Sequence, residues 1–450
     1  MSLKAPEFRA PLSFVDVDEG MTQATIFSLS SGQPPAGVAV IRLSGPLTRT
    51  VLETVSGSLP PPRHASLRTI RKRNGEVLDQ GLVLYFPGPN SFTGEDCAEL
   101  QVHGSRAVVN AVAETLRELS LRQAEAGEFA RRAFEHGRLD LVEVEGLSDL
   151  VSAETEMQRK LALQTGLGAL SAQYVGWAER LTYARAMIEA ELDFADEEDA
   201  PTSSSDLISA DLAILMKEMS EASSSAGSAE IIRNGFKVAI IGAPNAGKSS
   251  LLNAMAKREV AIVTDVAGTT RDVLTVELDM EGYLVRLFDT AGIREAEDIV
   301  EREGIQRARA AARSADMILY LRDAGSIAAP EEQFDVPSLT VETKSDLYPM
   351  LQSEAVRISS LTGEGLQIIH RAVVERARAS WNAGSLAGKE RHREHIALAS
   401  KFIEDAIKEP RLELKADALR AAGTELGRIT GRVDVEDLLD VIFSKFCIGK

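Results

Sequence analysis

The feature that most restricts the fold of this chain is a glycine-rich loop that follows an apolar run. The loop spans residues 242–249, with the sequence GAPNAGKS, and the apolar run is 238–241. A buried strand delivers the chain to such a loop, whose backbone N–H groups face a phosphate, and the next helix adds its positive end. Lys248 is expected to reach the β- and γ-phosphates, and the Ser249 hydroxyl to bind Mg²⁺. Because strand, loop and helix occur in the required order, we interpret the segment as a nucleotide-binding loop rather than an ordinary turn.

Four further elements follow in the order that a GTPase needs. Residues 268–272 (GTTRD) supply a threonine hydroxyl that can complete the Mg²⁺ shell, and the aspartate of 289–292 (DTAG) can hold Mg²⁺ through water. Residues 343–346 (TKSD) end another β run and place Asp346 to accept from the guanine N1–H and exocyclic amine. Residues 359–363 (SSLTG) are expected to close the base pocket. This order predicts a GTPase, and the choice of guanine by Asp346 excludes ATP.

Two positions depart from the pattern of regulatory GTPases. The base-recognition element begins with Thr343 instead of Asn, so no amide is present to tie loops together, which places nucleotide affinity in question. Ile293 stands where a glutamine would orient the attacking water. Glu301 is a candidate general base, the alternative being a surface carboxylate beside Arg302. Asn245 offers a carbonyl oxygen at which a monovalent cation could replace the charge of an arginine finger.

The composition limits the classes of function open to the chain. With 450 residues, 44% of them hydrophobic, about three domains are expected. The net charge of −18 disfavours non-specific nucleic-acid binding, which depends on basic residues. Any RNA contact should therefore be local, at Arg131 and Arg132 or within 389–393, although solvated helix faces are the alternative there. Cys97 and Cys447 form no ligand pair, and no run approaches the ~18 apolar residues of a membrane span, so a cytoplasmic location is expected.

Changes of pattern along the chain predict a nucleotide domain inserted into a helical one. Residues 1–20 carry little pattern and are expected to be a disordered extension, with Met21 an equally good start. The fold class expected is multidomain, with an α+β N-terminal domain, an all-α domain and an inserted α/β domain with the phosphate loop. The predicted boundaries are 21–138 for the N-terminal domain, 139–232 and 379–450 for the two parts of the helical domain, and 233–378 for the GTPase domain.

Local signals give the expected elements of the first part of the chain. Strands are predicted within 25–45, at 81–86 and around 98–102, and the 3.6-residue period predicts a helix over 108–119. Arg42 and Glu99 interrupt apolar strands, where a charge is costly unless it is paired or used. Before the phosphate loop, a short helix is expected at about 207–221, followed by a flexible serine- and glycine-rich segment at 223–227.

From about Thr25 to Lys450 the chain resembles the family of the tRNA modification GTPase MnmE, also called TrmE. The segments that carry the resemblance are PGPNSFTGED at 87–96, GEF at 127–129, RLD at 138–140, AGTTRD at 267–272 and FCIGK at 446–450. The resemblance implies a homodimer that hydrolyses GTP when its two nucleotide domains meet, with K⁺ serving as the missing finger. It also implies a folate-binding N-terminal domain that takes part in dimerisation. An FAD-dependent partner, MnmG (GidA), is implied as well, with which C5 of the wobble uridine of certain tRNAs receives a carboxymethylaminomethyl or aminomethyl group.

The resemblance further implies roles for individual residues. K⁺ ligands fall on Asn245, Thr264, Val266 and Thr269. Mg²⁺ ligands fall on Ser249 and Thr270, and the catalytic glutamate falls on Glu301. Contacts to 5-formyltetrahydrofolate fall on Arg42, Glu99, Arg138 and Lys450. Motifs and resemblance together place GTP on Asn245, Ala246, Gly247, Lys248, Ser249, Ser250, Thr264, Thr269, Thr270, Asp289, Thr290, Ala291, Gly292, Lys344, Asp346, Ser359 and Ser360.

Cys447 and the class of GTPase each leave an alternative open. Cys447 is fourth from the C-terminus, but Gly449 and Lys450 spoil a prenylation signal. We interpret its thiol as a candidate catalytic participant in one-carbon chemistry beside a folate, with a buried cysteine as the alternative.

The alternative function for the chain is a non-modifying RNA-binding switch, such as a ribosome-assembly GTPase. Such a switch would need neither a folate pocket nor a terminal thiol, and would usually carry a basic RNA module.

Overall fold

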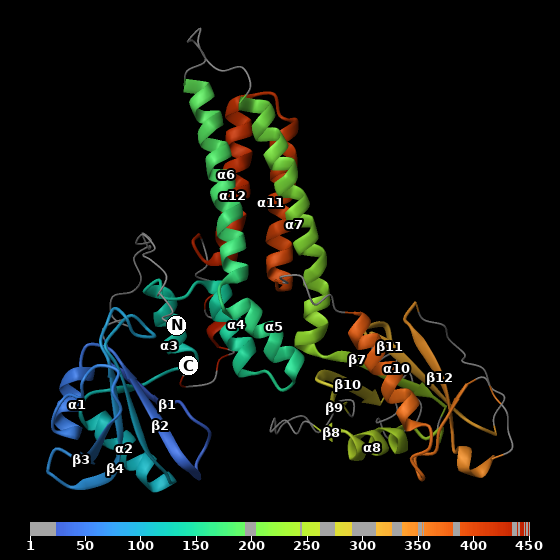
Figure 1. The fold of residues 1–450 in the computed structure, drawn as a ribbon, viewed down its shortest axis with the longest axis horizontal. Helices are drawn as coiled ribbons and strands as arrows, with labels where there is room; N and C mark the ends of the chain where they lie inside the picture. The colour runs from blue at the N-terminus through green and yellow to red at the C-terminus, as the bar shows by residue number, and fades with distance from the viewer. Residues whose placement is uncertain are drawn as a thin grey trace, which may run out of the picture. The chain divides into compact units, whose positions relative to one another are not determined.

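The computed structural model of the chain consists of two compact units, residues 1–148 with 430–450, and residues 149–429 (Figure 1). The residues that it describes are 24–193, 204–243, 245–261, 275–289, 312–325, 335–349, 353, 355–380, 388–433, 439, 442–444, 446 and 449. The expected fold class is confirmed, because an α+β part, a set of long helices and an α/β part with a mostly parallel sheet are all present. Within the described residues, none of the helices combines the length and apolar character that a bilayer crossing requires.

The first unit is built on a six-stranded sheet with the order β3-β4-β5-β2-β1-β6. Its strands are β1 (Ile26–Leu29), β2 (Ala36–Ser44), β3 (Ser66–Arg71), β4 (Val77–Phe86), β5 (Cys97–Gly104) and β6 (Arg122–Gln123). Its helices are α1 (Thr48–Ser56), α2 (Arg106–Glu118), α3 (Glu128–Glu135) and the start of α4 (Leu141–Val151). All pairings are antiparallel except that of β1 with β6.

The core of this unit follows from alternation in the strands and an apolar stripe on the helices. Ile41 and Leu100 point from β2 and β5 into one buried cluster with Leu52 of α1 and Leu116 of α2. The start of α2 is fixed by Ser105, whose hydroxyl accepts from the Val108 N–H at 3.2 Å, as is common for a serine at that position. Helices α1 and α2 thus cover one face of the sheet.

Long helices dominate the middle of the chain and its last third. They are α5 (Glu156–Gly166), α6 (Ala169–Asp193), α7 (Ser204–Asn234), α11 (Glu390–Lys408) and α12 (Leu412–Thr430). In Figure 1, α6, α7, α11 and α12 run side by side, and charged pairs join neighbours: Arg180 bonds Asp211 between α6 and α7, and His395 bonds Glu425 between α11 and α12.

The prediction of a short helix at 207–221 followed by a flexible segment at 223–227 is wrong, because α7 is continuous to Asn234. Serine and glycine are poor helix formers only by fractions of a kcal/mol to about 1 kcal/mol per residue. Tertiary packing outweighs this, since the buried positions Met219 and Ile232 lie on either side of the serine run and hold both halves of the helix against neighbours.

The GTPase part contains a seven-stranded sheet with the order β13-β12-β11-β7-β10-β9-β8. The strands are β7 (Phe236–Gly242), β8 (Val260–Ala261), β9 (Thr275–Met280), β10 (Tyr283–Asp289), β11 (Met317–Asp323), β12 (Ser338–Thr343) and β13 (Val356–Arg357). The associated helices are α8 (Lys248–Arg258), the 3-10 turn η1 (Ser345–Leu347) and α10 (Leu366–Ala379). In this sheet β9 pairs antiparallel with both β8 and β10, and the other pairings are parallel. The central strand β7 is buried on both faces, as its continuous apolar run predicts, and its carboxyl end leads to the phosphate loop.

Candidate functional site

The phosphate loop connects the end of β7 to the first residue of α8. Asn245 and Gly247 have φ values of 64° and 88°, in the left-handed region, so the backbone turns tightly into the helix. Lys248 opens α8, and its ammonium donates to the carbonyl oxygens of Gly242 at 2.7 Å and Ala243 at 2.9 Å. The lysine charge is therefore held over the backbone of the loop, the place from which it can meet the phosphates of a nucleotide.

Thr343 links the base-recognition element to this loop. Its hydroxyl donates to the carbonyl oxygen of Ala246 at 2.8 Å and lies 3.3 Å from that of Arg322, and the residue is only 2% exposed. A Cβ added to Gly247 would lie 3.4 Å from the Thr343 side chain, so the two segments are in close contact. The shorter threonine thus reaches the loop carbonyl directly and joins the two loops without an amide.

The residues predicted to recognise guanine lie at the carboxyl ends of β11 and β12. Lys344 takes a left-handed conformation, with φ of 60°, and its ammonium bonds Asp323 at 2.6 Å. The hydrogen bond from Lys344 holds the pKa of Asp323 below its usual range, and the same bond raises the pKa of Lys344. Asp346 follows in η1 and is exposed. Ser359 is fully buried, and its N–H donates to the carbonyl oxygen of Glu364 at 3.0 Å. An exposed carboxylate next to a fixed lysine is what recognition of a guanine edge requires.

Several predicted site residues fall outside the described part of the chain. They are Thr264, Val266, Thr269, Thr270, Thr290, Ala291, Gly292, Glu301, Cys447 and Lys450. Asp289 ends β10, where its backbone pairs with Ile240 of β7, so the DTAG element starts beside the strand that carries the phosphate loop. Among the predicted metal ligands, the structure describes Asn245, expected to bind K⁺, and Ser249, expected to bind Mg²⁺. Amide and hydroxyl oxygens are ligands that suit these hard cations.

In the first unit, Arg42 and Glu99 stand directly opposite one another on β2 and β5. Arg42 Nη2 lies 3.0 Å from Glu99 Oε1, and both side chains are largely buried. The Arg42 guanidinium also lies over the rings of Phe92 and Phe129, at 5.5 and 5.9 Å from their centres. Its charge is thus paired and stacked, as expected for a charge on an apolar strand. Arg138 comes close to the same loop as Phe92, since a Cβ on Gly94 would lie 3.4 Å from Arg138 Cγ.

The sequence did not predict a buried ion network in the same unit. Arg132, only 2% exposed, bonds Glu95 and Glu128, each at 3.0 Å, and Glu95 also accepts from the Ser44 hydroxyl at 2.6 Å. Arg132 is therefore unavailable for the RNA contact considered above. A signal was present, because Arg132 follows Phe129 by three residues on the apolar face of α3.

The C-terminal segment returns to this sheet. Gly449 accepts a hydrogen bond from the Ser30 hydroxyl at 2.9 Å, and a Cβ on Gly449, whose φ is 109°, would lie 2.5 Å from the carbonyl oxygen of Leu29. Phe443 makes a similarly close approach to Gly127. Gly449 thus lies beside the turn between β1 and β2, in the unit that contains Arg42 and Glu99.

Comparison with solved structures gives likenesses confined to part of the chain. The G domain of the FeoB iron transporter of T. maritima is 26% identical, over 32% of this chain and 98% of that chain, with a TM-score of 0.24. The FeoB G domain of Methanococcus jannaschii is 20% identical over the same shares, with a TM-score of 0.25.

Comparison with family models and curated proteins covers nearly the whole chain. Residues 25–138 match the model of the GTP-binding protein TrmE N-terminus, and residues 141–447 match that of the MnmE helical domain. The protein named tRNA modification GTPase MnmE of Rhizobium etli is 56% identical over 96% of this chain and 100% of its own length. Its namesake in Brucella ovis is 49% identical over 96% of this chain and 99% of its own length. The chain therefore belongs to the family of the tRNA modification GTPase MnmE.

Proposed function

We propose that this tRNA modification GTPase is stimulated by K⁺ and modifies C5 of the wobble uridine in certain tRNAs. It would act as a homodimer with an FAD-dependent MnmG-type partner and a tetrahydrofolate one-carbon unit. The observation that carries the GTP hydrolase activity is the junction of Thr343 with Ala246, which joins a phosphate loop to a guanine-recognition element. Asp346 and Lys248 then serve the two ends of one nucleotide, the base and the phosphates.

K⁺ is proposed to bind Asn245, Thr264, Val266 and Thr269, and Mg²⁺ to bind Ser249 and Thr270. The left-handed backbone at Asn245 supports this reading, since it sets the exposed amide apart from the helix that follows. Ile293 has no group that could orient water, so a cation would supply the positive charge that an arginine finger supplies elsewhere. Glu301 is proposed as the general base for the attacking water.

A folate is proposed to bind in the first unit, at Arg42, Glu99, Arg138 and Lys450. The carboxylate of Glu99 suits the amidine-like edge of a pterin, and cationic side chains suit its formyl and carboxylate groups. The return of Gly449 to Ser30 supports the inclusion of the terminal residues, and with them the role of Cys447 in one-carbon chemistry. With a net charge of −18, the contact with tRNA is expected to be local or shared with the partner protein.

The test is the nucleoside composition of tRNA from cells that lack this protein, measured by mass spectrometry. Loss of the modified wobble uridine, restored by the parent but not by Lys248→Ala or Glu99→Ala, is the expected result. Unchanged nucleosides together with accumulated ribosomal precursor particles would favour a ribosome-assembly GTPase instead. Hydrolysis of GTP by the purified protein should also be several-fold faster in K⁺ than in Na⁺ at equal ionic strength. Equal rates would remove the cation from the proposal.

A further inference from the structure

Helix α5 shares the hydrophobic core of the GTPase sheet, although it precedes that part of the chain. Met157 and Leu161 of α5 are 9% and 1% exposed and belong to one buried cluster with Met280 and Val285 of the sheet. Ile232, at the end of α7, belongs to the same cluster. Removing α5 from the sheet would expose this apolar surface, so α5 is energetically part of the GTPase core.

The hairpin formed by β9 and β10 ends in a turn that caps α5. Glu281 and Gly282 both have positive φ, 52° and 87°, as in a two-residue hairpin turn. The Gly282 N–H donates to Asp279 Oδ1 at 2.7 Å, and the Gly282 carbonyl accepts from the Met157 N–H at 3.0 Å. Met157 lies in the first turn of α5, where backbone N–H groups have no acceptor within the helix. The hairpin therefore satisfies a donor that α5 cannot satisfy alone.

The other end of this hairpin adjoins, in the sequence, the two elements expected to help hold Mg²⁺, which in GTPases are ordered by contacts to the γ-phosphate and Mg²⁺. β9 begins at Thr275, soon after the GTTRD element at 268–272, and β10 ends at Asp289, the first residue of DTAG. The two strands pair in continuous register from the turn to the pair of Thr275 with Phe288. Such a paired hairpin is a rigid element, able to carry a displacement from one end to the other.

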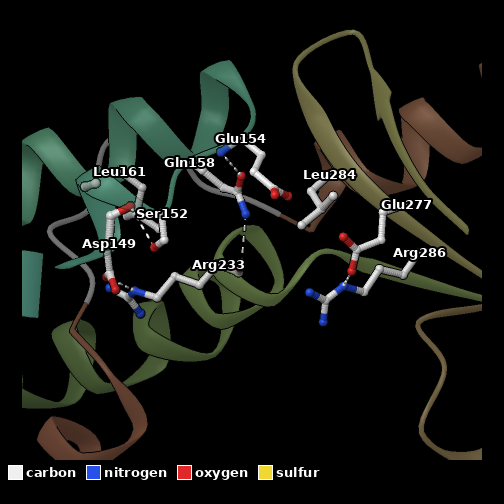
Figure 2. A pocket seen from close by; sticks show the side chains of 10 residues that line it. Asp149, Ser152, Glu154, Gln158, Leu161, Arg233, Glu277, Leu284 and Arg286 are labelled. Carbon is white, nitrogen blue, oxygen red and sulfur yellow. Dashed lines mark hydrogen bonds and ion pairs between the residues drawn. The ribbon is translucent and has the colours of Figure 1, made fainter. Parts of the chain in front are cut away.

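A cavity of about 370 Å³ lies beside the contact between hairpin and helix. Figure 2 shows Glu277 and Arg286 on the hairpin at one side, and Gln158 and Arg233 at the other. Arg286 Nε lies 2.9 Å from Glu277 Oε1, so this ion pair joins two residues of the hairpin. Arg233 Nε donates to Asp149 Oδ2 at 2.8 Å, and this second ion pair lies on the other side of the cavity. A shift of the hairpin can thus change the cavity without separating these pairs, whereas a fully packed interior would resist it.

Helix α5 is also tied to the end of α7, one of the long helices. The Gln158 side chain donates to the carbonyl oxygen of Arg233 at 3.0 Å and accepts from the N–H groups of Glu154 and Thr155, each at 3.0 Å. α5 continues through Gly168 into α6, which runs along α7. A change in the position of α5 is therefore passed to the long helices.

We propose that α5 is the output element of the GTPase domain, and that the contact of Gly282 with Met157 is the point at which the nucleotide state reaches the helical domain. The proposal goes beyond GTP hydrolysis, because the contact lies away from the phosphate loop and has no part in the chemistry. A nucleotide can act through it only by favouring one hairpin position over another. The exchange of the Met157 N–H with solvent then reports the state of the contact.

The experiment compares hydrogen exchange of the full-length chain in saturating GDP and in a non-hydrolysable GTP analogue. In the parent, the peptide that contains Met157 should exchange at rates that differ several-fold between the two nucleotides. Gly282→Ala should abolish this difference, since its Cβ would lie 3.3 Å from that of Glu156 on a strained backbone. Asp279→Ala should weaken it by releasing the Gly282 N–H without a clash.

The matched control is Gly75→Ala. Gly75 has a similar positive φ of 92° in another hairpin turn, but a Cβ there would meet nothing within 4 Å. This variant should keep the parent's difference, and nucleotide affinity should stay unchanged in all three variants. Equal exchange of the α5 peptide in the two nucleotide states of the parent would overturn the proposal. So would a difference that persists in both Gly282→Ala and Asp279→Ala.

Discussion

At the scale of single residues, one hydroxyl decides how two loops of the nucleotide site are joined. The carbonyl oxygen of Ala246 is buried, and Thr343 is the side chain that donates to it. A buried acceptor that loses its donor costs about 1–3 kcal/mol. Because the phosphate loop is held in place partly through this carbonyl, we expect part of that cost to appear as weaker nucleotide binding.

Thr343→Val keeps the shape of the side chain and removes the hydroxyl. We expect GDP affinity to fall roughly tenfold, the equivalent of about 1.4 kcal/mol. Without the hydrogen bond the free loop is less ordered, and the free energy needed to order it opposes binding. Titration with a fluorescent GDP derivative measures this. Thr343→Ser should retain most of the affinity, and Thr340→Val, on the same strand, serves as the control for a general loss of β12 packing. A GDP affinity within twofold of that of the parent would show that the hydrogen bond from Thr343 to Ala246 does not contribute to nucleotide binding.

How much of the site the sequence could predict depends on the chemistry of each residue. The order of phosphate loop, DTAG and TKSD elements was predictable, because phosphate and guanine recognition fix residue types at fixed spacings. The contact of Thr343 with the loop was not, because it depends on how closely Gly247 approaches that side chain in three dimensions. Similarly, the burial of Arg132 depends on partners on other elements, Glu95 among them.

At the scale of elements, α3 is held by charges as well as by its apolar face. Burial of Glu128 acts to raise the pKa of its carboxyl, but hydrogen bonds from Arg122 and the Glu125 N–H, with the charge of Arg132, outweigh it and lower the pKa below 4.5. A carboxyl whose pKa is depressed by folding adds stability above its unfolded pKa, and this stability is lost as the pH falls through the folded pKa.

Glu128→Gln should therefore lower thermal stability by an amount that depends on pH. The difference from the parent should be fully present at pH 6. It should shrink as the pH falls from about 4.5, where the carboxyl of the unfolded chain takes up a proton, through the lower pKa of the folded protein. Differential scanning calorimetry of both proteins from pH 6 downward measures it. Glu114→Gln, at an exposed position of α2 in the same unit, is the control. A difference that is constant with pH would mean that Glu128 acts through shape and not through charge.

Elements were predicted best where one period ran unbroken. The helix at α2 and the strands β2 and β5 carry clear apolar periods, and all three were predicted. Helix α1 was not predicted, because its β-branched threonines and valines are weak helix formers. Strand β3 was not predicted either, because only Leu67, which is exposed, and Ile70, which is buried, stand as apolar residues among its arginines. The contact between α5 and the β9–β10 hairpin could not be predicted, because it joins segments far apart in the sequence through backbone groups that carry no residue signature.

At the scale of the whole molecule, the two candidate sites lie in units with separate cores. The cluster that contains Leu100 supports Arg42 and Glu99, whereas the cluster that contains Val238 supports the phosphate loop. Substitutions that act on one site without disturbing its core should therefore leave binding at the other unchanged.

Glu99→Ala should weaken binding of 5-formyltetrahydrofolate about ten- to a hundredfold, since a charge-assisted hydrogen bond contributes about 1.5–3 kcal/mol. Its affinity for GDP should remain that of the parent. Lys248→Ala should show the reverse, with GDP binding lost and folate binding kept. Isothermal titration calorimetry of each protein with each ligand measures all four affinities, and Glu114→Ala controls for changes in the charge of the first unit. Loss of both ligands in Glu99→Ala would show unfolding or coupling between the units, and unchanged folate affinity in that variant would remove Glu99 from the pocket.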